Sequence, residues 1–482
     1  MSLLAKLRWI LAILICLSLG TVLFTSSITP GYAIQDSFIV EAEASQVSAT
    51  MLTQMEPINT TIYLPLVANY WADVTPNFGV QFYGNLNAAS GLDTIAEAGA
   101  RWVRVPINWA AIEPVNTTPE HYNWTSLDLS IENATAHDIN LVLILGGQPA
   151  WAAEYPMGPV YDTAELHEFL GALVERYSEV TYFEIYNEPD NASVEHAELG
   201  GFGYWGNNGT GYAGLLRGLY PVIKSANPEA QVVIGGLALD YYEDQGGIFV
   251  RSFLDDVLAA CQGHDCFDVM NFHYYPPFRP NWEPYGRDII GKANYVRQKL
   301  AEYGFESMPV ICTEFSWSGG GNWGTDKLQS DYVVKGYVRT MAARLPIAIW
   351  FMKHDGGQVD LPGLLDRNLQ PKPAYYAYQV MTQQLQHAIY QRPLNIVETG
   401  SSSMEGYIFQ VGRHRMDVVW TEGSTWNSQD APVLPYTVTA SRLLVIDKWG
   451  NEVLYTDAQD GVMGQRITIM VDDSPLYLVY EP

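Results

Sequence analysis

Two glutamates at the ends of predicted strands carry the chemistry that this sequence suggests. Residues 180–186 alternate β-branched and aromatic side chains, and the strand that they predict ends at Asn187-Glu188-Pro189 because proline cannot continue a β-ladder. A second predicted strand, 310–314, ends at Glu314. If both strands belong to a parallel barrel, the two carboxylates face the same mouth. Such a pair can divide the work of a general acid and of a nucleophile or base between its members.

The elements around these glutamates predict a (β/α)8 barrel over residues 73–386. Strand and helix patterns alternate along this part of the chain, as they do in β/α units. The predicted strands are 78–83, 102–106, 141–145, 180–186, 232–234, 269–273, 310–314 and 347–351. The predicted helices are 91–98, 127–136, 163–177, 212–226, 249–260, 287–303, 327–343 and 374–385.

The last part of the chain has a different pattern. Short alternating strands are predicted at 418–420, 442–446, 452–455, 467–471 and 476–479. Gly, Asp and Asn separate them, which is typical of turns between antiparallel strands. We therefore predict a small antiparallel β-sandwich over residues 387–482.

The first residues predict export. Lys6 and Arg8 precede an apolar run that ends near Leu19, and small residues follow at 31–33, which together indicate a signal peptide over 1–33. An uncleaved membrane anchor is the alternative, but the run is short for a membrane span. Residues 34–72 predict a low-complexity linker in which 62–67 could form an edge strand. We expect a secreted or cell-surface protein with no integral membrane domain beyond the signal peptide.

The composition favours a neutral partner. The 482 residues carry a formal net charge of −27, which repels nucleic acid and anionic membranes, so neither is an expected partner. The 14 Trp and 31 Tyr residues offer flat apolar surfaces of the kind that stack on sugar rings. Core packing and strand propensity account for most of these aromatic residues, so composition alone is a weak sign of a carbohydrate partner, whether an oligo- or a polysaccharide.

The cysteines predict one disulfide. Cys261 and Cys266 bracket a short loop and would pair outside the cell, whereas a zinc pair is the alternative. Cys312, two residues before Glu314, is predicted to be a buried free thiol that points into the barrel. No cofactor and no metal site are expected.

The sequences around the two glutamates resemble the clan A glycoside hydrolases. Asn187-Glu188-Pro189 and Thr313-Glu314-Phe315 carry the resemblance, which covers roughly residues 77–385. These are retaining enzymes built on a (β/α)8 barrel. The pattern at 107–114 and the terminal sandwich are similar to families 39, 42 and 5, with family 39 nearest because its sandwich can recruit an N-terminal strand. Tyr186 departs from the pattern, since tryptophan commonly precedes Asn-Glu.

The resemblance implies roles for the two glutamates and two of their neighbours. Glu188 matches the acid/base and Glu314 matches the nucleophile of the clan. Arg104 matches the second-strand arginine that supports the nucleophile. Asn187 matches the asparagine that binds the 2-hydroxyl group of the sugar.

The resemblance also implies further substrate-binding residues. His273 and Tyr275 match the sixth-strand His-x-Tyr, whose tyrosine orients the nucleophile, and Trp350 matches the eighth-strand tryptophan under the reactive sugar. Trp151 follows the third predicted strand, where it could line the cleft or pack at the rim.

Other polar residues near the predicted rim are interpreted as structural and not as catalytic. Glu184 would face inward below Glu188, and a buried carboxylate needs a partner, so we expect it to pair with a buried arginine or tyrosine. Glu113 is read as a helix or turn residue. His354 and Asp355 follow the eighth predicted strand, where they could contact sugar hydroxyl groups or form part of a solvated loop, and the solvated loop is the favoured interpretation.

These observations favour a retaining glycoside hydrolase that acts on O-glycosyl bonds. The bond would be β-glycosidic, or α-L-arabinosidic, and cleavage would pass through a glycosyl-Glu314 intermediate. A non-catalytic carbohydrate-binding barrel and a surface structural protein are the alternatives. The presence of both carboxylates and of Arg104 favours the enzyme. A retaining enzyme also requires the two carboxyl groups to lie about 5–5.5 Å apart.

Overall fold

The computed structural model describes residues 78–198, 203–321, 324–356, 361–423, 430–457 and 464–481. The predicted signal peptide, the linker and the edge strand at 62–67 lie outside these ranges, and the predicted domain boundaries stay predictions. Within the described ranges, no helix combines the length and the apolar character that a membrane crossing needs.

Eight parallel strands form the predicted barrel, which confirms this part of the fold. They are β1 (Phe78–Gln81), β2 (Trp102–Asn108), β3 (Asn140–Gly146), β4 (Tyr182–Asn187), β5 (Gln231–Gly236), β6 (Met270–Tyr274), β7 (Val310–Phe315) and β8 (Ala348–Trp350). Hydrogen-bonded neighbours follow the order β5-β4-β3-β2-β1-β8-β7-β6. Parallel bridges from Val233 to Val269 and from Leu237 to Phe272 join β5 to β6, so the barrel closes.

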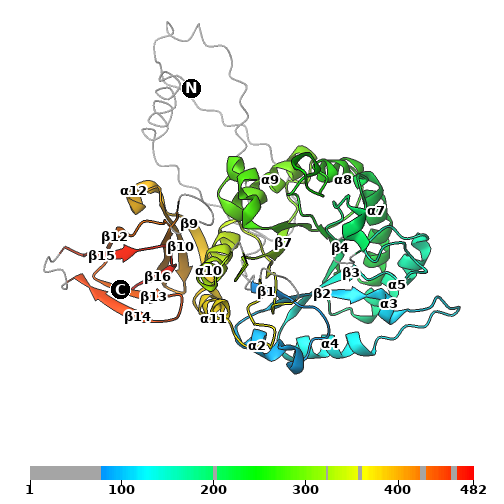
Figure 1. Cartoon of the computed structure of the whole chain (residues 1–482), viewed down its shortest axis with the longest axis horizontal. Coiled ribbons are helices and arrows are strands. Elements are labelled where there is room, and N and C mark those ends of the chain that lie inside the picture. The colour runs from blue at the N-terminus through cyan, green and yellow to red at the C-terminus, as the bar shows by residue number, and fades with distance from the viewer. Residues whose placement is uncertain are drawn as a thin grey trace, which may run out of the picture. The chain divides into compact units, whose positions relative to one another are not determined.

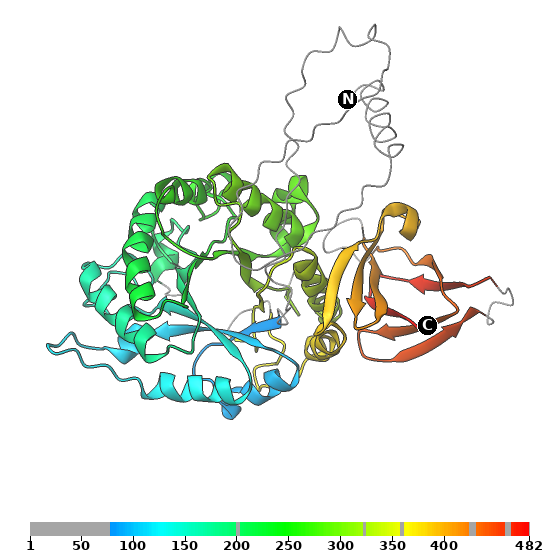
Figure 2. The same cartoon turned by 180° about the vertical axis from the view of Figure 1, so that it is seen from behind.

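Helices surround the strands, as Figures 1 and 2 show from opposite sides. The described helices of the barrel are α2 (Leu92–Glu97), α3 (Trp109–Ile112), α4 (Thr125–Ala136), α5 (Thr163–Arg176), α6 (Val194–Glu198), α7 (Gly209–Ala226), α8 (Phe253–Cys261), α9 (Asp288–Glu302), α10 (Asp326–Ala342) and α11 (Pro373–Leu385). All eight predicted helices are present. The additional α3 and α6 have only four and five residues, which is too short for a clear helical period.

A layer of apolar side chains fills the bottom of the barrel. Its members come from strands all around the barrel and are Trp102, Val142, Val233, Val269, Ile311, Ile347 and Ile349. Gly79 completes the layer, since a Cβ there would overlap the side chain of Ile349. Because side chains alternate along a strand, residues two positions later, such as Arg104, Glu184 and Thr313, lie one layer higher and face inward.

Two backbone irregularities change this alternation at the upper ends of β4 and β7. Between β6 and β7 the register shifts, so that Phe272 pairs with Cys312 but His273 pairs with Glu314. Thr313 is the extra residue of this bulge. In β4, Tyr186 has a φ of +68°, in the left-handed region that is strained for a tyrosine.

The bulge corrects the predicted orientation of Cys312. This thiol is free and buried, as predicted, but it packs in the apolar layer between strands and helices and does not point into the barrel. Ile311 and Thr313 take the inward positions on either side of it. The bulge then lets Glu314 face inward directly after Thr313, which alternation alone does not allow.

The C-terminal part forms two antiparallel sheets, as expected. The six-stranded sheet has the order β14-β13-β16-β11-β10-β9, and β12 pairs with β15. The elements are β9 (Ala388–Pro393), α12 (Ile396–Thr399), β10 (Met404–Val411), β11 (His414–Thr421), β12 (Leu434–Thr439), β13 (Arg442–Asp447), β14 (Glu452–Thr456), β15 (Arg466–Val471) and β16 (Leu476–Tyr480). Apolar side chains of both sheets form one core, which includes Val419, Leu443, Val438 and Ile469.

The sequence did not predict β9, β10 and β12. The first six residues of β10 are all buried, so this strand lacks the alternation of a half-exposed strand. β9 and β12 each contain a proline, which argues against a strand in sequence-based reasoning.

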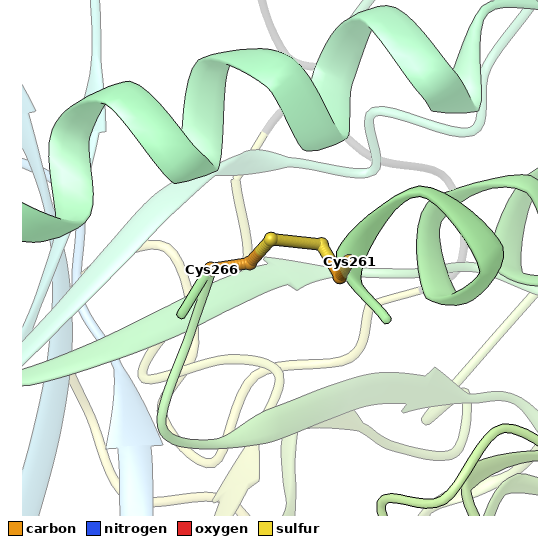
Figure 3. Close-up of a disulfide and its surroundings, with 2 residues drawn as sticks. All are labelled: Cys261 and Cys266. Atoms are coloured by element: carbon orange, nitrogen blue, oxygen red, sulfur yellow. A yellow bond between two sulfur atoms is a disulfide. The ribbon is translucent and has the colours of Figure 1, made fainter. Parts of the chain in front are cut away.

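The predicted disulfide is present. Cys261 at the end of α8 is bonded to Cys266 in the loop before β6, with the two Cα atoms 6.0 Å apart (Figure 3). The two sulfur atoms bond each other and not a metal, so the prediction of a disulfide is confirmed over the zinc alternative.

A buried arginine joins α10 to the C-terminal sheets. Arg339 is 2% exposed and forms ion pairs with Asp288 at 3.1 Å, Glu405 at 2.7 Å and Glu422 at 2.6 Å. Its positive charge offsets three carboxylates in a region from which water is largely excluded. The removal of one partner from such a buried group leaves uncompensated charge, which is strongly destabilising.

We therefore expect Arg339→Met to lower the free energy of unfolding by about 3–5 kcal/mol. Urea unfolding followed by circular dichroism measures this loss. Arg251→Met is the matched control, because the ion pair of Arg251 with Asp244 is exposed and its loss should cost about 0–1 kcal/mol. Equal losses in the two variants would contradict the role assigned to Arg339.

Candidate active site

The barrel brings the two predicted glutamates together. Glu188 follows the last residue of β4, Glu314 lies at the end of β7, and each is 5% exposed. One carboxylate oxygen from each and one ring nitrogen of His273 all lie within 4.8 Å of one another. Retaining glycosidases hold their carboxyl groups about 5–5.5 Å apart, whereas inverting ones need about 6.5–9.5 Å. Two oxygens at most 4.8 Å apart favour the retaining arrangement over the inverting one.

Arg104 on β2 forms the centre of the hydrogen-bond network below the pair. Its guanidinium donates to both oxygens of Glu184 at 2.8 and 2.7 Å, to Oε1 of Glu314 at 2.6 Å and to Oδ1 of Asn187 at 2.6 Å. Glu184 is thus the partner of a buried arginine, as predicted. Gln81 on β1 accepts a further bond from Arg104 at 2.9 Å. One cation therefore fixes the positions of β1, β2, β4 and β7 at this level of the barrel.

The environments of the two glutamates differ. Burial raises the pKa of the Glu188 carboxyl well above its usual range, and the negative charge of Glu314 adds to the rise. Burial also raises the pKa of the Glu314 carboxyl, but Arg104 and the hydroxyl of Tyr275 oppose that rise. A proton shared by the pair therefore rests on Glu188 and leaves Glu314 ionised.

His273 and Tyr275 take the positions expected of them. Nδ1 of His273 lies 2.9 Å from Oε1 of Glu188, and the Tyr275 hydroxyl donates to Oε2 of Glu314 at 2.7 Å. Burial lowers the pKa of His273 well below its usual range, with Arg104 and Lys292 contributing, so its ring is neutral. Each glutamate thus has its own ring-bearing partner from the end of β6.

The structure contradicts the position expected for Trp350. Its ring is fully buried, packs against Phe315 and Tyr332, and donates from Nε1 to the carbonyl of Pro362. Ile349 faces the barrel interior, so strand alternation turns Trp350 outward and Phe351 inward.

Phe351 takes the place near the glutamates instead. This partly exposed ring meets Tyr83 and Tyr275 edge to face, with centroids 6.2 and 6.4 Å apart. Tyr83 is 44% exposed, and its ring contact with Phe351 places it at the same site. Tyr83, Tyr275 and Phe351 therefore form the aromatic wall beside Glu314.

Trp151 and the residues after β8 have packing roles in the described structure. Trp151 is partly exposed, meets Trp109 edge to face at 5.4 Å and donates to the carbonyl of Glu113 at 3.3 Å. The expectation of a solvated loop is wrong for Asp355, which is 5% exposed and ion-paired with Lys372 at 3.1 Å. Glu113 is a buried residue at the end of α3 and accepts from Trp109, in keeping with its structural reading.

Sequence reasoning missed four polar or small residues that shape the site. Asn271 contacts Thr313, and Thr313 contacts His273, from the layer below the glutamates. Lys292 on α9 is fully buried and pairs with Asp240 at 2.9 Å. Gly236 ends β5 where a Cβ would overlap Nε2 of His273. Inward polar residues two positions before a site residue, such as Asn271 before His273, were the available signal.

Gly236→Ala should lower kcat/KM by about 100-fold, because the new methyl group displaces His273 and a displacement of 1 Å costs about that much. Steady-state kinetics measure the loss. Gly214→Ala is the matched control: on α7 a Cβ at this position meets nothing within 4 Å, so activity should be unchanged. Equal activity of the two variants would contradict the tight seating of His273.

The described residues contain one cluster with metal-ligand geometry, formed by Glu188, His273 and Glu314. Arg104 lies 2.6 Å from Glu314 and already neutralises its charge. A cation bound there would therefore meet the guanidinium, and we assign no metal to this cluster.

Comparison with known proteins identifies relatives of the barrel. The family described as Cellulase (glycosyl hydrolase family 5) matches residues 68–356, which is more than half of the chain. No curated protein matches the sequence.

Several solved structures share the fold. A family 39 glycoside hydrolase from Bacteroides cellulosilyticus has 20% identity and a TM-score of 0.64, over 84% of this chain and 81% of that one. A family 39 β-xylosidase from Caulobacter crescentus has 16% identity and a TM-score of 0.59, over 85% of this chain and 97% of that one. A family 30 endoxylanase from Clostridium papyrosolvens has 12% identity and a TM-score of 0.56, over 84% of this chain and 96% of that one.

Proposed function

The chain belongs to the cellulase family of glycosyl hydrolases, family 5, and from this membership we propose that it hydrolyses β-glycosidic bonds of oligo- or polysaccharides by double displacement. Glu188 is the proposed acid/base and Glu314 the proposed nucleophile. The observation that carries the proposal is the pair of carboxylates within 4.8 Å of His273 and of each other, in environments that place the proton on Glu188.

The geometry supports a two-step reaction. In the first step, Glu188 donates its proton to the leaving oxygen while an oxygen of Glu314 bonds to the anomeric carbon and the glycosidic bond breaks. Arg104 and Tyr275, both bonded to Glu314, hold the nucleophile ionised and oriented. In the second step, Glu188 takes a proton from water, and the water oxygen displaces Glu314 from the sugar.

The charges of the site favour a neutral sugar. Arg104 and Lys292 are the described cations whose charges act on His273 at the centre of the site. Arg104 is paired with Glu184 and Glu314, and Lys292 is paired with Asp240. A carboxylate on the substrate would find neither cation unpaired. A neutral β-linked sugar is therefore the proposed substrate, and xylose, the sugar in the names of two similar structures, is the first one to test.

Secretion is part of the proposal. The disulfide between Cys261 and Cys266 supports it, because such bonds persist in oxidising compartments. An extracellular enzyme would also meet polysaccharides directly. Expression with an export assay, in which the protein is sought in the medium and in the cell fraction, tests this part.

The test of function is hydrolysis by the purified protein. Wild type and the Glu314→Ala protein, purified in parallel, would each be incubated with a panel of substrates. The panel contains aryl β-glycosides, an aryl α-L-arabinofuranoside, and soluble β-glucans and xylans. We expect cleavage of at least one neutral β-linked substrate by wild type alone. Sugar binding by calorimetry without cleavage of any substrate would instead support the non-catalytic carbohydrate-binding barrel.

A further inference from the structure

The bulge in β7 places a threonine hydroxyl behind the histidine that contacts the proposed acid/base. Oγ1 of Thr313 lies 3.2 Å from Nε2 of His273, and Nδ1 of the same ring lies 2.9 Å from Oε1 of Glu188. Asn271 follows behind, with Nδ2 2.8 Å from Oγ1 of Thr313. Asn271, Thr313 and His273 are all fully buried, so every donor in this row needs a partner within the protein.

The backbone fixes the orientation of the Asn271 amide. Its Oδ1 lies 3.1 Å from the backbone nitrogen of Thr313, and an N–H group can only donate. Nδ2 is therefore the group that faces Thr313, and it donates to Oγ1. Because Oγ1 accepts this bond, its single hydrogen is left to donate elsewhere.

Two acceptors lie within reach of the Thr313 hydrogen, and His273 is favoured. Oε1 of Glu184 is 3.4 Å away and already accepts from Arg104 at 2.7 Å and from the backbone nitrogen of Gly236 at 3.0 Å. Nε2 of His273 is nearer, at 3.2 Å. A Cβ at Gly236 would overlap Nε2, so glycine leaves the ring its position beside the hydroxyl.

The other side of the ring requires a donor. Nδ1 of His273 lies 2.9 Å from Glu188 and 3.7 Å from Oε2 of Glu314. A lone pair on Nδ1 would be repelled by the charged carboxylate of Glu314 and, once Glu188 has given up its proton, by that of Glu188, whereas an N–H group there is attracted to both. Since the ring is neutral, it has one hydrogen, and that hydrogen belongs on Nδ1.

We infer that Thr313 is a positioning residue for the acid/base: with Asn271 it holds His273 as the Nδ1–H tautomer, so that a neutral ring donates to Oε1 of Glu188. The hydrogen bonds then run in one direction, from Asn271 to Thr313, to His273 and to Glu188. The inference rests on the proposed role of Glu188.

The consequence for catalysis concerns the two oxygens of Glu188. Oε1 is occupied by the His273 donor in both protonation states, so the transferable proton sits on Oε2. In the first step this proton moves from Oε2 to the leaving oxygen, and in the second step a water proton returns to Oε2. His273 keeps its hydrogen throughout and stabilises the carboxylate that forms between the steps.

The charged groups that act on this row come from four strands or the segments after them and from one helix. Those acting on Glu188 or His273 are Arg104, Asp190, Asp240, Lys292 and Glu314, and Glu184 faces Thr313. A change at Thr313 leaves all of them in place. A shift in the behaviour of Glu188 in such a variant therefore reports the donor from His273.

The tautomer can be measured without any substrate. In protein with 15N-labelled histidine, long-range proton–nitrogen correlation spectra distinguish Nδ1–H from Nε2–H rings, and His273→Gln identifies the signal of His273 among the nine histidines. We expect the Nδ1–H form in wild type and in Thr313→Ser, and a smaller population of that form in Thr313→Val, where nothing donates to Nε2. A wild-type His273 in the Nε2–H form would overturn the inference, whether or not the protein hydrolyses a glycoside.

Kinetics give a second readout. A smaller population of the donating tautomer disfavours the charged form of Glu188, so the carboxyl stays protonated to higher pH. The alkaline limb of kcat/KM for a substrate with a poor leaving group should therefore move up in Thr313→Val, by at most roughly one pH unit. Thr313→Ser should restore the wild-type profile. Thr382→Val is the matched control, because it loses a buried hydrogen bond from a threonine hydroxyl to the carbonyl of Ala98. The alkaline limb of this variant should stay where it is in wild type. An unmoved limb in Thr313→Val would contradict the inference.

Discussion

Glu314→Ala is expected to lower kcat by about 10⁵-fold or more, the largest effect of any single substitution in this barrel. The variant has no nucleophile to form the covalent intermediate, and Arg104 and Tyr275 lose the anion that they hold. Added azide can enter the space left by the side chain and attack the anomeric carbon directly. From a β-glycoside with a good leaving group, we expect the α-glycosyl azide, identified by NMR of the product.

A matched substitution separates this effect from the loss of a buried carboxylate in general. Glu113→Gln replaces a carboxylate that is 1% exposed and accepts from Trp109, away from the pair. Its activity should stay within a few-fold of wild type. Appreciable activity in Glu314→Ala, or a β-glycosyl azide from it, would show that another group attacks the sugar.

Glu188→Ala is expected to have effects that depend on the leaving group. Substrates whose leaving groups need protonation should lose about 10²–10⁴-fold in kcat/KM, whereas 2,4-dinitrophenyl glycosides should be little affected in the first step. Hydrolysis of the intermediate lacks its base, so the glycosyl-Glu314 species should accumulate. Azide needs no base, and it should restore turnover and give the β-glycosyl azide.

A plot of log kcat/KM against the pKa of the phenol leaving group measures this prediction. A steep slope for Glu188→Ala beside a shallow slope for wild type is the expected pair of results. Equal slopes in the two proteins would mean that the proton comes from a group other than Glu188.

Strand periodicity was sufficient to predict the barrel and the positions of its two glutamates. All eight predicted strands are present, because apolar inward residues such as Ile311 and Ile349 alternate with residues that pack under the helices. The clan A resemblance is confirmed. Three families were named from the sequence. The chain matches the family 5 model, and enzymes of family 39 share its fold.

Interruptions of this alternation could not be predicted from the sequence. The bulge at Thr313 depends on how β6 pairs with β7, which is a property of two segments about 40 residues apart. Without it, Cys312 would have the same orientation as Glu314, as the sequence suggested. The left-handed Tyr186 likewise depends on packing that a local pattern does not contain.

The orientation of Trp350, by contrast, could have been predicted from the sequence. Ile347 and Ile349 alternate inward, so period two already places Phe351 on the inner face and Trp350 on the outer one. The resemblance to the eighth-strand tryptophan of clan A led to the wrong position for Trp350, although strand alternation indicated the correct one. For Asp355, by contrast, the partner Lys372 is 17 residues away, and nothing local indicated a buried ion pair.

The most direct test of the proposed mechanism is to trap its covalent intermediate. Wild-type protein would be incubated with the 2-deoxy-2-fluoro glycoside of the sugar that it cleaves best, digested with a protease, and analysed by tandem mass spectrometry. We expect one fluorosugar per chain, attached to Glu314, and no label in Glu314→Ala. A label on another residue would contradict the assignment of the nucleophile, and a product of inverted anomeric configuration with no label would contradict double displacement itself.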